Sequence, residues 1–219
     1  MIKLPPFGHG QRIGLFGGSF NPGHAGHRMV ALYALRRLKL DFVWWLVSPQ
    51  NPLKDIHETG DYTERFNAAQ KIARHPRFVV TDLEKQIDSP MTAETLKALS
   101  VAMRQAHFVW IMGADSFRDL DHWHQWSRIV GTLPLAILAR PGYSMGALGG
   151  QAANRFARRR VPNEQSGVLA TRKAPAWVFI SMPLRKESSS AIRQTRENSR
   201  ATHKMEHLPQ AGVTQTEVV

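Results

Sequence analysis

The chain has 219 residues, of which 42% are hydrophobic and 21% are charged, as is ordinary for a globular protein of one domain. It contains no cysteine, which excludes disulfides and thiolate metal sites, and no apolar run of about 18 residues that could span a membrane. Because the first residues also lack the apolar core of a signal peptide, we expect a cytoplasmic protein.

The net charge of +12 is unevenly distributed. Residues 151–204 hold 12 Lys and Arg residues against 3 Asp and Glu residues, which accounts for three quarters of the net charge. A basic segment of this kind could attract nucleic acid or a membrane surface. It carries no nucleic-acid-binding motif and no interleaved aromatic residues, so we expect a solvated face, with neither nucleic acid nor a membrane as partner.

Apolar runs and helical periodicity alternate along the chain. The run RIGLF at 12–16 predicts a strand, and the segment 25–38 predicts a helix because its apolar residues recur at helical spacing. The alternation continues with predicted helices over 61–75, 89–104 and 117–129, and predicted strands over 41–49, 77–84, 107–115, 133–142 and 177–184. Strands that alternate with helices predict an α/β protein with a doubly wound parallel sheet covered on both faces.

We predict a single domain over residues 12–196, preceded by a short extension at 1–11. Residues 142–174 interrupt the alternation and are rich in Gly, Ala and Arg, which predicts an irregular insertion. The C-terminal tail at 197–219 has little apolar content, which predicts flexibility.

Polar clusters follow several predicted strands at their carboxyl ends, where open parallel sheets bind ligands. The most distinctive cluster is GGSFNPGHAGHR at 17–28. Gly17 and Gly18 allow a tight turn and a close approach of the backbone to an anion, and the helix that starts near His24 would direct N–H groups at that anion. His24 and His27 share one helix face and can both donate to phosphate oxygens.

Two other interpretations of this segment stay open on the residues alone. A zinc site would need a third ligand, and the spacing of His24 and His27 differs from the HExxH pattern. An ordinary loop needs no ligand at all. The chain has neither a GxxxxGK[ST] P-loop nor a GxGxxG dinucleotide motif, so we favour phosphate binding of another kind and predict no metal ligands in the chain.

Two signature motifs in this sequence resemble those of a known superfamily. GGSFNPGHAGH at 17–27 is similar to the (G/S)xFxPxHxGH signature of the HxGH-motif nucleotidyltransferases, and ESSSAIR at 187–193 is similar to their second signature, commonly ISSTxIR. Three further segments, PMTAETL at 90–96, MGADSFRDLDHWHQW at 112–126 and ARPGY at 139–143, resemble the bacterial nicotinate-nucleotide adenylyltransferases within that superfamily. The resemblance covers roughly residues 12–196 and is weakest through the predicted insertion.

This resemblance implies a Rossmann-like fold and a reaction of NAD biosynthesis. The enzyme would transfer AMP from ATP, with Mg²⁺, to nicotinate mononucleotide, giving nicotinate adenine dinucleotide and pyrophosphate. The residues agree with that chemistry, because the attacking phosphate is already anionic and requires no protein nucleophile or strong base. The protein must instead bring two anions together and stabilise the charge of the transferring phosphoryl group and of the pyrophosphate.

By position, the resemblance assigns His24, His27 and Arg193 to catalysis. ATP binding would also involve the residues of two loops and of the second signature, Gly17, Gly18, Ser19, Phe20, Gly113, Asp115, Ser189 and Ser190. Lys54, Thr92 and Trp123 would bind nicotinate mononucleotide, with Trp123 offering a flat face to the pyridine ring. Simpler structural roles compete with some of these: helix capping for Ser188–Ser190 and Asp115, an exposed side chain for Lys54, and core packing for Trp123.

The sequence departs from the family pattern at Asn21, where Asp is frequent, and at Glu187, where Ile is common. The rival activities within the superfamily use nicotinamide mononucleotide or pantetheine phosphate as the acceptor. His24 and the segment around Trp123 argue against pantetheine phosphate, whereas the residues do not separate the acid from the amide. From another class, a basic nucleic-acid-binding protein would explain residues 151–204 but not the two phosphate signatures. The sequence predicts no oligomeric state.

Overall fold

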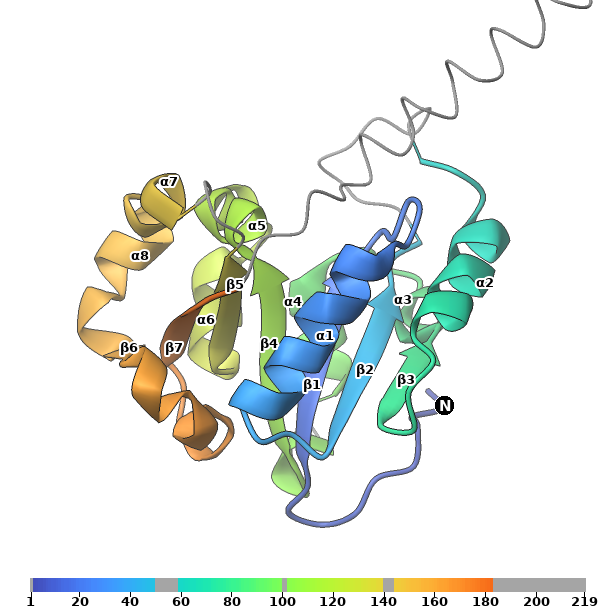
Figure 1. Cartoon of the computed structure of the whole chain (residues 1–219), viewed down its shortest axis with the longest axis horizontal. Coiled ribbons are helices and arrows are strands. Elements are labelled where there is room, and N and C mark those ends of the chain that lie inside the picture. Colours follow the sequence, from blue (N-terminus) through green and yellow to red (C-terminus); the bar gives the residue numbers. More distant parts are fainter. Residues whose placement is uncertain (1, 50–58, 100–101, 140–143, 183–219) are drawn as a thin grey trace, which may run out of the picture.

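A computed structural model describes residues 2–49, 59–99, 102–139 and 144–182. Within these residues the chain forms a sheet of seven strands, all parallel, in the order β3-β2-β1-β4-β5-β7-β6 (Figure 1). The strand bounds are β1 Arg12–Gly18, β2 Phe42–Val47, β3 Phe78–Thr81, β4 His107–Gly113, β5 Leu135–Ala139, β6 Arg160–Val161 and β7 Trp177–Ser181. The predicted α/β class with a doubly wound parallel sheet is confirmed.

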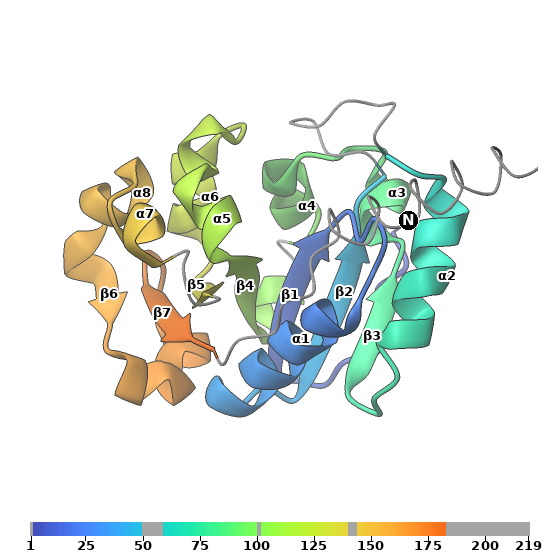
Figure 2. The same cartoon turned by 45° about the horizontal axis from the view of Figure 1, so that its top comes forward.

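The direction in which strands are added reverses between β1 and β4. The chain first builds outward from β1 to β2 and β3, then returns to place β4 on the other side of β1 and continues to β5 and β7. Figure 2 brings the carboxyl ends of these strands toward the reader. Helices leave on opposite faces at such a reversal, so a crevice opens above the carboxyl ends of β1 and β4.

Helices cover both faces of the sheet, and each face has its own apolar layer. The helices α1 Ala25–Arg37 and α2 Tyr62–Ile72 pack on one face, against residues such as Phe16 and Trp45. The opposite face, which carries Ile13 and Leu15, is covered by α3 Leu83–Ile87, α4 Thr92–Ala98, α5 Ala114–Arg118 and α6 Trp126–Thr132. Figure 1 shows α1 in front of the sheet and α4 behind it. Successive residues of each strand face these two apolar layers in turn, so both faces of the strand are buried. This burial explains why the strand sequences are continuous apolar runs.

The segment predicted as an irregular insertion is folded against the sheet. Its described residues form the helices α7 Ser144–Leu148 and α8 Gln151–Arg155, the 3₁₀ helices η4 Ala157–Arg159 and η5 Asn163–Thr171, and strand β6, which pairs with β7. The expectation of irregular chain is wrong for these residues, because small alanines such as Ala152 and Ala153 are buried and let short helices approach the core closely.

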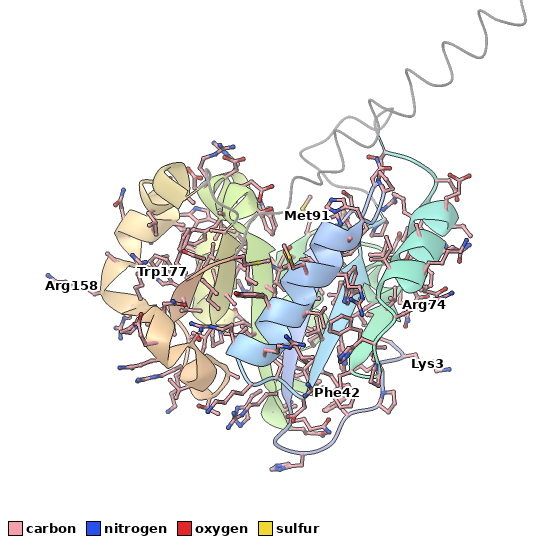
Figure 3. The ribbon with its side chains drawn as sticks, in the orientation of Figure 1. Lys3, Phe42, Arg74, Met91, Arg158 and Trp177 are labelled. Carbon is pink, nitrogen blue, oxygen red and sulfur yellow. The ribbon has the colours of Figure 1, made fainter. Side chains whose placement is uncertain are left out.

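The basic residues of this segment are divided between aromatic faces and solvent. The guanidinium of Arg155 lies 5.2 Å from the ring centre of Trp126, and that of Arg160 lies 5.3 Å from the ring centre of Trp177. Arg158 points outward from the edge of the molecule (Figure 3). Two of the arginines that could have formed a free cationic patch are therefore oriented by cation–π contacts.

Two predicted helices are shorter than their periodicity indicated. The helix predicted over 89–104 becomes α4 and a 3₁₀ turn, η2 Ala102–Arg104. The helix predicted over 117–129 is interrupted: after the 3₁₀ turn η3 Leu120–His122, Trp123 is extended (φ −79°, ψ 140°) and Gln125 adopts a left-handed conformation (φ 51°) before α6 starts. This interruption turns Trp123 and His124 toward the crevice.

The N-terminal residues pack on the sheet although they form no helix or strand. The ring of Phe7 meets the rings of Trp44 and Phe108 edge-on, at centroid distances of 5.9 and 6.2 Å. The backbone N–H of Lys3 donates to Oε1 of Gln86 over 2.8 Å. These contacts attach the extension to the face that carries α3. None of the helices in the described part of the chain is both long and apolar enough to cross a membrane.

Candidate active site

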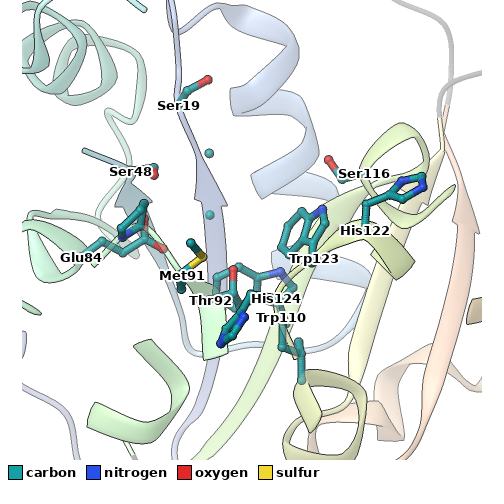
Figure 4. A pocket seen from close by; sticks show the side chains of 14 residues that line it. Ser19, Ser48, Glu84, Met91, Thr92, Trp110, Ser116, His122, Trp123 and His124 are labelled. Atoms are coloured by element: carbon teal, nitrogen blue, oxygen red, sulfur yellow. The ribbon is translucent and has the colours of Figure 1, made fainter. Parts of the chain in front are cut away.

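A cavity of about 360 Å³ opens at the carboxyl ends of β1 and β2, beside β4 (Figure 4). It occupies the crevice that the reversal of strand order creates. The residues that line it are Gly17, Gly18, Ser19, Ser48, Glu84, Pro90, Met91, Thr92, Trp110, Ser116, His122, Trp123, His124 and Ile129. Five of the predicted site residues are among them: Gly17 and Gly18 at the end of β1, Ser19 in the loop that joins β1 to α1 (the first loop), and Thr92 and Trp123 on the opposite wall.

The first loop is held by an aromatic anchor. Phe20 is only 1% exposed and has a left-handed backbone (φ 45°), which is uncommon for a residue with a side chain. Its ring stacks on Trp45 at 5.0 Å and meets the rings of Phe16 and His27 edge-on at 5.4 and 5.1 Å. The buried ring of Phe20 therefore holds the first loop against the core. The side chain does not line the cavity, so a contact between Phe20 and ATP would have to use the backbone of Phe20.

Helix α1 begins at the two predicted histidines. Nδ1 of His24 accepts from the backbone N–H of Gly26 over 3.1 Å, and Nδ1 of His27 accepts from the backbone N–H of His24 over 3.2 Å. A ring nitrogen that accepts carries no hydrogen, so each neutral ring has its N–H at Nε2. The histidines thus form a reciprocal cap of the kind usually built from Ser or Thr with Glu, and the ring centres lie 3.9 Å apart.

This helix terminus is electrostatically suited to an anion. The first turn of α1 contains no acidic residue, and the last turn contains Arg36 and Arg37. The positive end of the helix dipole is therefore left without a carboxylate of its own helix, which favours a phosphate there. Neither His24 nor His27 lines the 360 Å³ cavity itself; both follow the loop that does.

The second predicted ATP-binding segment lies where β4 passes into α5. Gly113 is the N-cap of α5, and Asp115 in its first turn is exposed. An oxygen of the Asp115 carboxylate lies where a side chain at position 113 would have to sit, so only glycine leaves the carboxylate in this position. Gly113 and Asp115 do not line the cavity, although the next residue, Ser116, does. Lys54, Glu187, Ser188, Ser189, Ser190 and Arg193 lie outside the described residues.

The wall opposite the first loop carries the predicted acceptor-binding residues. Thr92 is the first residue of α4 and is 8% exposed, and the half-buried indole of Trp123 borders the cavity (Figure 4). Trp126, by contrast, packs edge-on against Phe156 at 6.0 Å. Of these two indoles, Trp123 lines the cavity and Trp126 does not.

Sequence reasoning missed Glu84, whose carboxyl group lines the cavity although its side chain is only 3% exposed. The sequence predicts one strand over 77–84, but β3 ends at Thr81, whose Oγ1 accepts from the backbone N–H of Leu83 over 3.0 Å and starts α3. Burial raises the pKa of Glu84 to about 8, and a hydrogen bond with the Ser48 side chain opposes that shift. At neutral pH the carboxyl group is therefore mostly neutral.

We expect the stability of the protein to fall as the pH rises from about 4.5 to about 8. In this window the folded state keeps the Glu84 proton that the unfolded state has lost, so each pH unit costs up to about 1.4 kcal/mol of unfolding free energy. Glu84→Gln has no proton to lose and should remove this slope. Urea unfolding at pH 5 to 9 measures the effect, with the exposed Glu64→Gln as control. An unchanged slope in Glu84→Gln would contradict the assignment.

No three His, Asp or Glu side chains converge into a possible metal site among the residues that the structure describes. His122 and His124 both border the cavity, and Figure 4 shows their rings on different sides of Trp123. The donors at the first loop, two imidazoles and a helix terminus, instead suit the oxygens of a phosphate.

Comparison with known protein families gives a match over most of the chain. The model of the cytidylyltransferase-like family matches residues 15–195. A probable nicotinate-nucleotide adenylyltransferase of Rhizobium meliloti is 45% identical over 184 residues, which are 84% of this chain and 98% of the relative. A protein of Methylorubrum extorquens with the same description is 48% identical over 182 residues, covering 83% of this chain and 98% of that protein.

Solved structures share the fold at low sequence identity. A nicotinic acid mononucleotide adenylyltransferase of Plasmodium falciparum, solved in complexes with APC and with NaAD, superposes with a TM-score of 0.62 at 18% identity. The match covers 84% of this chain and 83% of that one. At this identity the likeness is one of fold.

Proposed function

The chain belongs to the cytidylyltransferase-like family and, within it, to the nicotinate-nucleotide adenylyltransferases, and from this membership we propose that it transfers AMP from ATP to nicotinate mononucleotide. The products would be nicotinate adenine dinucleotide and pyrophosphate. The observation that carries the proposal is the cavity that joins Gly17–Ser19, at the end of β1 and the start of the first loop, to the wall formed by Thr92 and Trp123. We propose that the first loop is the phosphate-binding loop. Its two ends suit the two parts of the acceptor, a phosphate and an aromatic ring.

The proposed step exchanges one bond to phosphorus for another. A phosphate oxygen of nicotinate mononucleotide forms a bond to the α-phosphorus of ATP while the bond from that phosphorus to the bridging oxygen breaks. Pyrophosphate leaves with the electron pair. Because the nucleophile is an anion already, the protein contributes position and charge stabilisation.

His27 and His24 would supply the charge stabilisation at the first loop. Their Nδ1 atoms are engaged in the cap of α1, so the hydrogen of each neutral ring is at Nε2. We propose that these Nε2–H groups and the N-terminal amides of α1 donate to the phosphate oxygens of ATP as negative charge shifts toward pyrophosphate. From the second signature, Arg193, Ser189 and Ser190 would act on the same phosphates, as the family resemblance implies.

ATP is proposed to enter as its Mg²⁺ complex, which makes the metal part of the substrate. Mg²⁺ prefers oxygen ligands and keeps several water molecules, so phosphates can provide most of its coordination.

The acceptor would place its pyridine ring against Trp123. A flat indole face that borders the cavity offers the stacking surface that an aromatic base requires. Thr92 begins α4, and we propose that its backbone N–H, in the first turn of that helix, donates to the carboxylate of the acceptor. Such a contact would favour the acid over the amide form of the nucleotide.

We expect the purified protein, with ATP and Mg²⁺, to use nicotinate mononucleotide at least about 100-fold better in kcat/KM than nicotinamide mononucleotide, because a site built for a charged group discriminates strongly against its neutral analogue. Release of pyrophosphate measures both reactions, with pantetheine phosphate as a third acceptor. Equal rates with acid and amide, or turnover of pantetheine phosphate alone, would overturn the acceptor assignment. No turnover with any of the three would overturn the activity.

A further inference from the structure

The side chain of Arg65, in α2, is 3% exposed and donates hydrogen bonds only to backbone carbonyls in the described structure. Nε donates to Gly60 over 2.8 Å, and Nη2 donates to Pro49 over 2.7 Å. Nη1 donates to both Ser19 and Ser48, over 2.8 Å each. One guanidinium thus uses all three of its nitrogens on four carbonyl oxygens.

These carbonyls belong to the segments that follow β1 and β2 and to Gly60, which lies two residues before α2. Ser19 and Ser48 line the cavity, and Figure 4 shows their side chains near the ends of the two neighbouring strands. The backbone N–H of Ser48 also donates to the carbonyl of Gly18 over 3.0 Å. Arg65 therefore connects the phosphate-binding loop to the end of β2 from beneath, without entering the cavity.

The charge of Arg65 is compensated by carbonyl dipoles and not by an ion pair. The described ion pairs join Lys97 to Glu94 and Arg118 to Asp119 and do not include Arg65. Burial lowers the pKa of its guanidinium, an effect that Tyr62 and Asp61 oppose. A buried cation that forms none of the described ion pairs is costly, so its presence beneath a loop for anionic ligands calls for a role there.

We propose that Arg65 is a positioning residue of the adenylyl transfer: by fixing the carbonyls of Ser19 and Ser48, it sets the distance between the phosphate-binding loop and the end of β2. The inference rests on the proposed function. Lysine cannot replace arginine in this role, because a single ammonium nitrogen cannot reach four carbonyls arranged around a planar fork. A displacement of the loop by about 1 Å is enough to lower turnover strongly.

We expect Arg65→Lys to lower kcat/KM for ATP at least about 10-fold per folded molecule at 20 °C, and Arg65→Gln to lower it further because it loses both the charge and most of the donors. Steady-state turnover, corrected for the folded fraction by circular dichroism, measures this. Arg77→Lys is the matched control: Arg77 donates to the carbonyl of Leu40 over 3.3 Å, at the opposite end of the sheet. We expect it to stay within about twofold of the original chain.

If Arg65 contributed only to the stability of the fold, its variants would behave differently in this experiment. Its variants would unfold at lower temperature while the folded molecules kept the original kcat and KM, and that outcome overturns the proposal. A variant that does not fold at all overturns it as well, since Arg65 would then serve the whole fold and not two loops. Turnover by the unsubstituted chain, measured in the same assay, tests the proposed function separately.

Discussion

Replacing His27 with alanine is expected to lower kcat at least about 100-fold, the usual cost of removing a preorganised donor to a developing negative charge. The imidazole has a fixed orientation because its Nδ1 accepts from the backbone N–H of His24 and its ring lies against Phe20. Because the ring is already oriented before the reaction starts, no free energy is needed to orient it in the transition state. The expected loss therefore appears mainly in kcat, and a change confined to KM would reduce His27 to a ground-state binding residue.

His27 also caps α1, so the alanine variant tests two roles at once. His27→Gln separates them, because glutamine at this position of a capping box can still accept from the backbone N–H of His24. We expect the alanine variant to lose about 0.5–2 kcal/mol of stability and the glutamine variant to lose less, while both lose the imidazole and most of kcat. His107→Ala, an exposed histidine at the amino end of β4, is the control and should leave turnover unchanged.

Replacing Gly17 with alanine is expected to destabilise the protein by about 1–3 kcal/mol and to reduce kcat/KM as well. A methyl group at this position would lie 2.7 and 2.9 Å from the Cζ2 and Cη2 atoms of Trp110. The indole of Trp110 is 2% exposed, so we expect the end of β1 to shift, and with it the loop that follows. Because that loop carries Ser19 and leads to His24, the displacement should reach the proposed ATP site.

Gly131→Ala is the matched control for this substitution. Gly131 lies in α6, and a methyl group there would meet no atom within 4 Å. Since alanine favours the helix more than glycine does, this variant should gain up to about 1 kcal/mol. Thermal unfolding of the two variants should thus shift in opposite directions. Shifts of the same sign would show that the contact with Trp110 is not what requires glycine at position 17.

The predictions that succeeded from sequence rested on local information. The apolar run at 12–16, the glycines that follow it and the histidines that start α1 are neighbours in the chain, so their pattern is sufficient to predict strand, loop and helix. The parallel sheet and the crevice at its carboxyl edge follow from the alternation of elements. The expectation that Trp123 binds the acceptor came from family resemblance; its indole lines the cavity, and its role stays a prediction.

The features that sequence reasoning missed depend on contacts between distant segments. In the sequence, Arg65 is one arginine of a predicted amphipathic helix. No neighbouring residue in the chain indicates that its partners are the backbone carbonyls of Ser19 and Ser48. Glu84 reads as the polar end of a strand, and only the folded chain buries it. The interruption at Trp123–Gln125 requires a left-handed glutamine, a conformation for which that residue carries no strong preference.

The proton on Glu84 stabilises the folded protein at low pH, whereas the risk of aggregation is greatest at high pH, near the isoelectric point. The isoelectric point of the chain is near 10.7, and a basic protein loses self-repulsion as the buffer approaches that value. Raising the pH in that direction also removes the Glu84 proton, whose pKa is about 8. A mildly acidic buffer keeps both the positive charge that opposes aggregation and the neutral carboxyl group that the fold requires, so it is the better medium for storage and crystallisation.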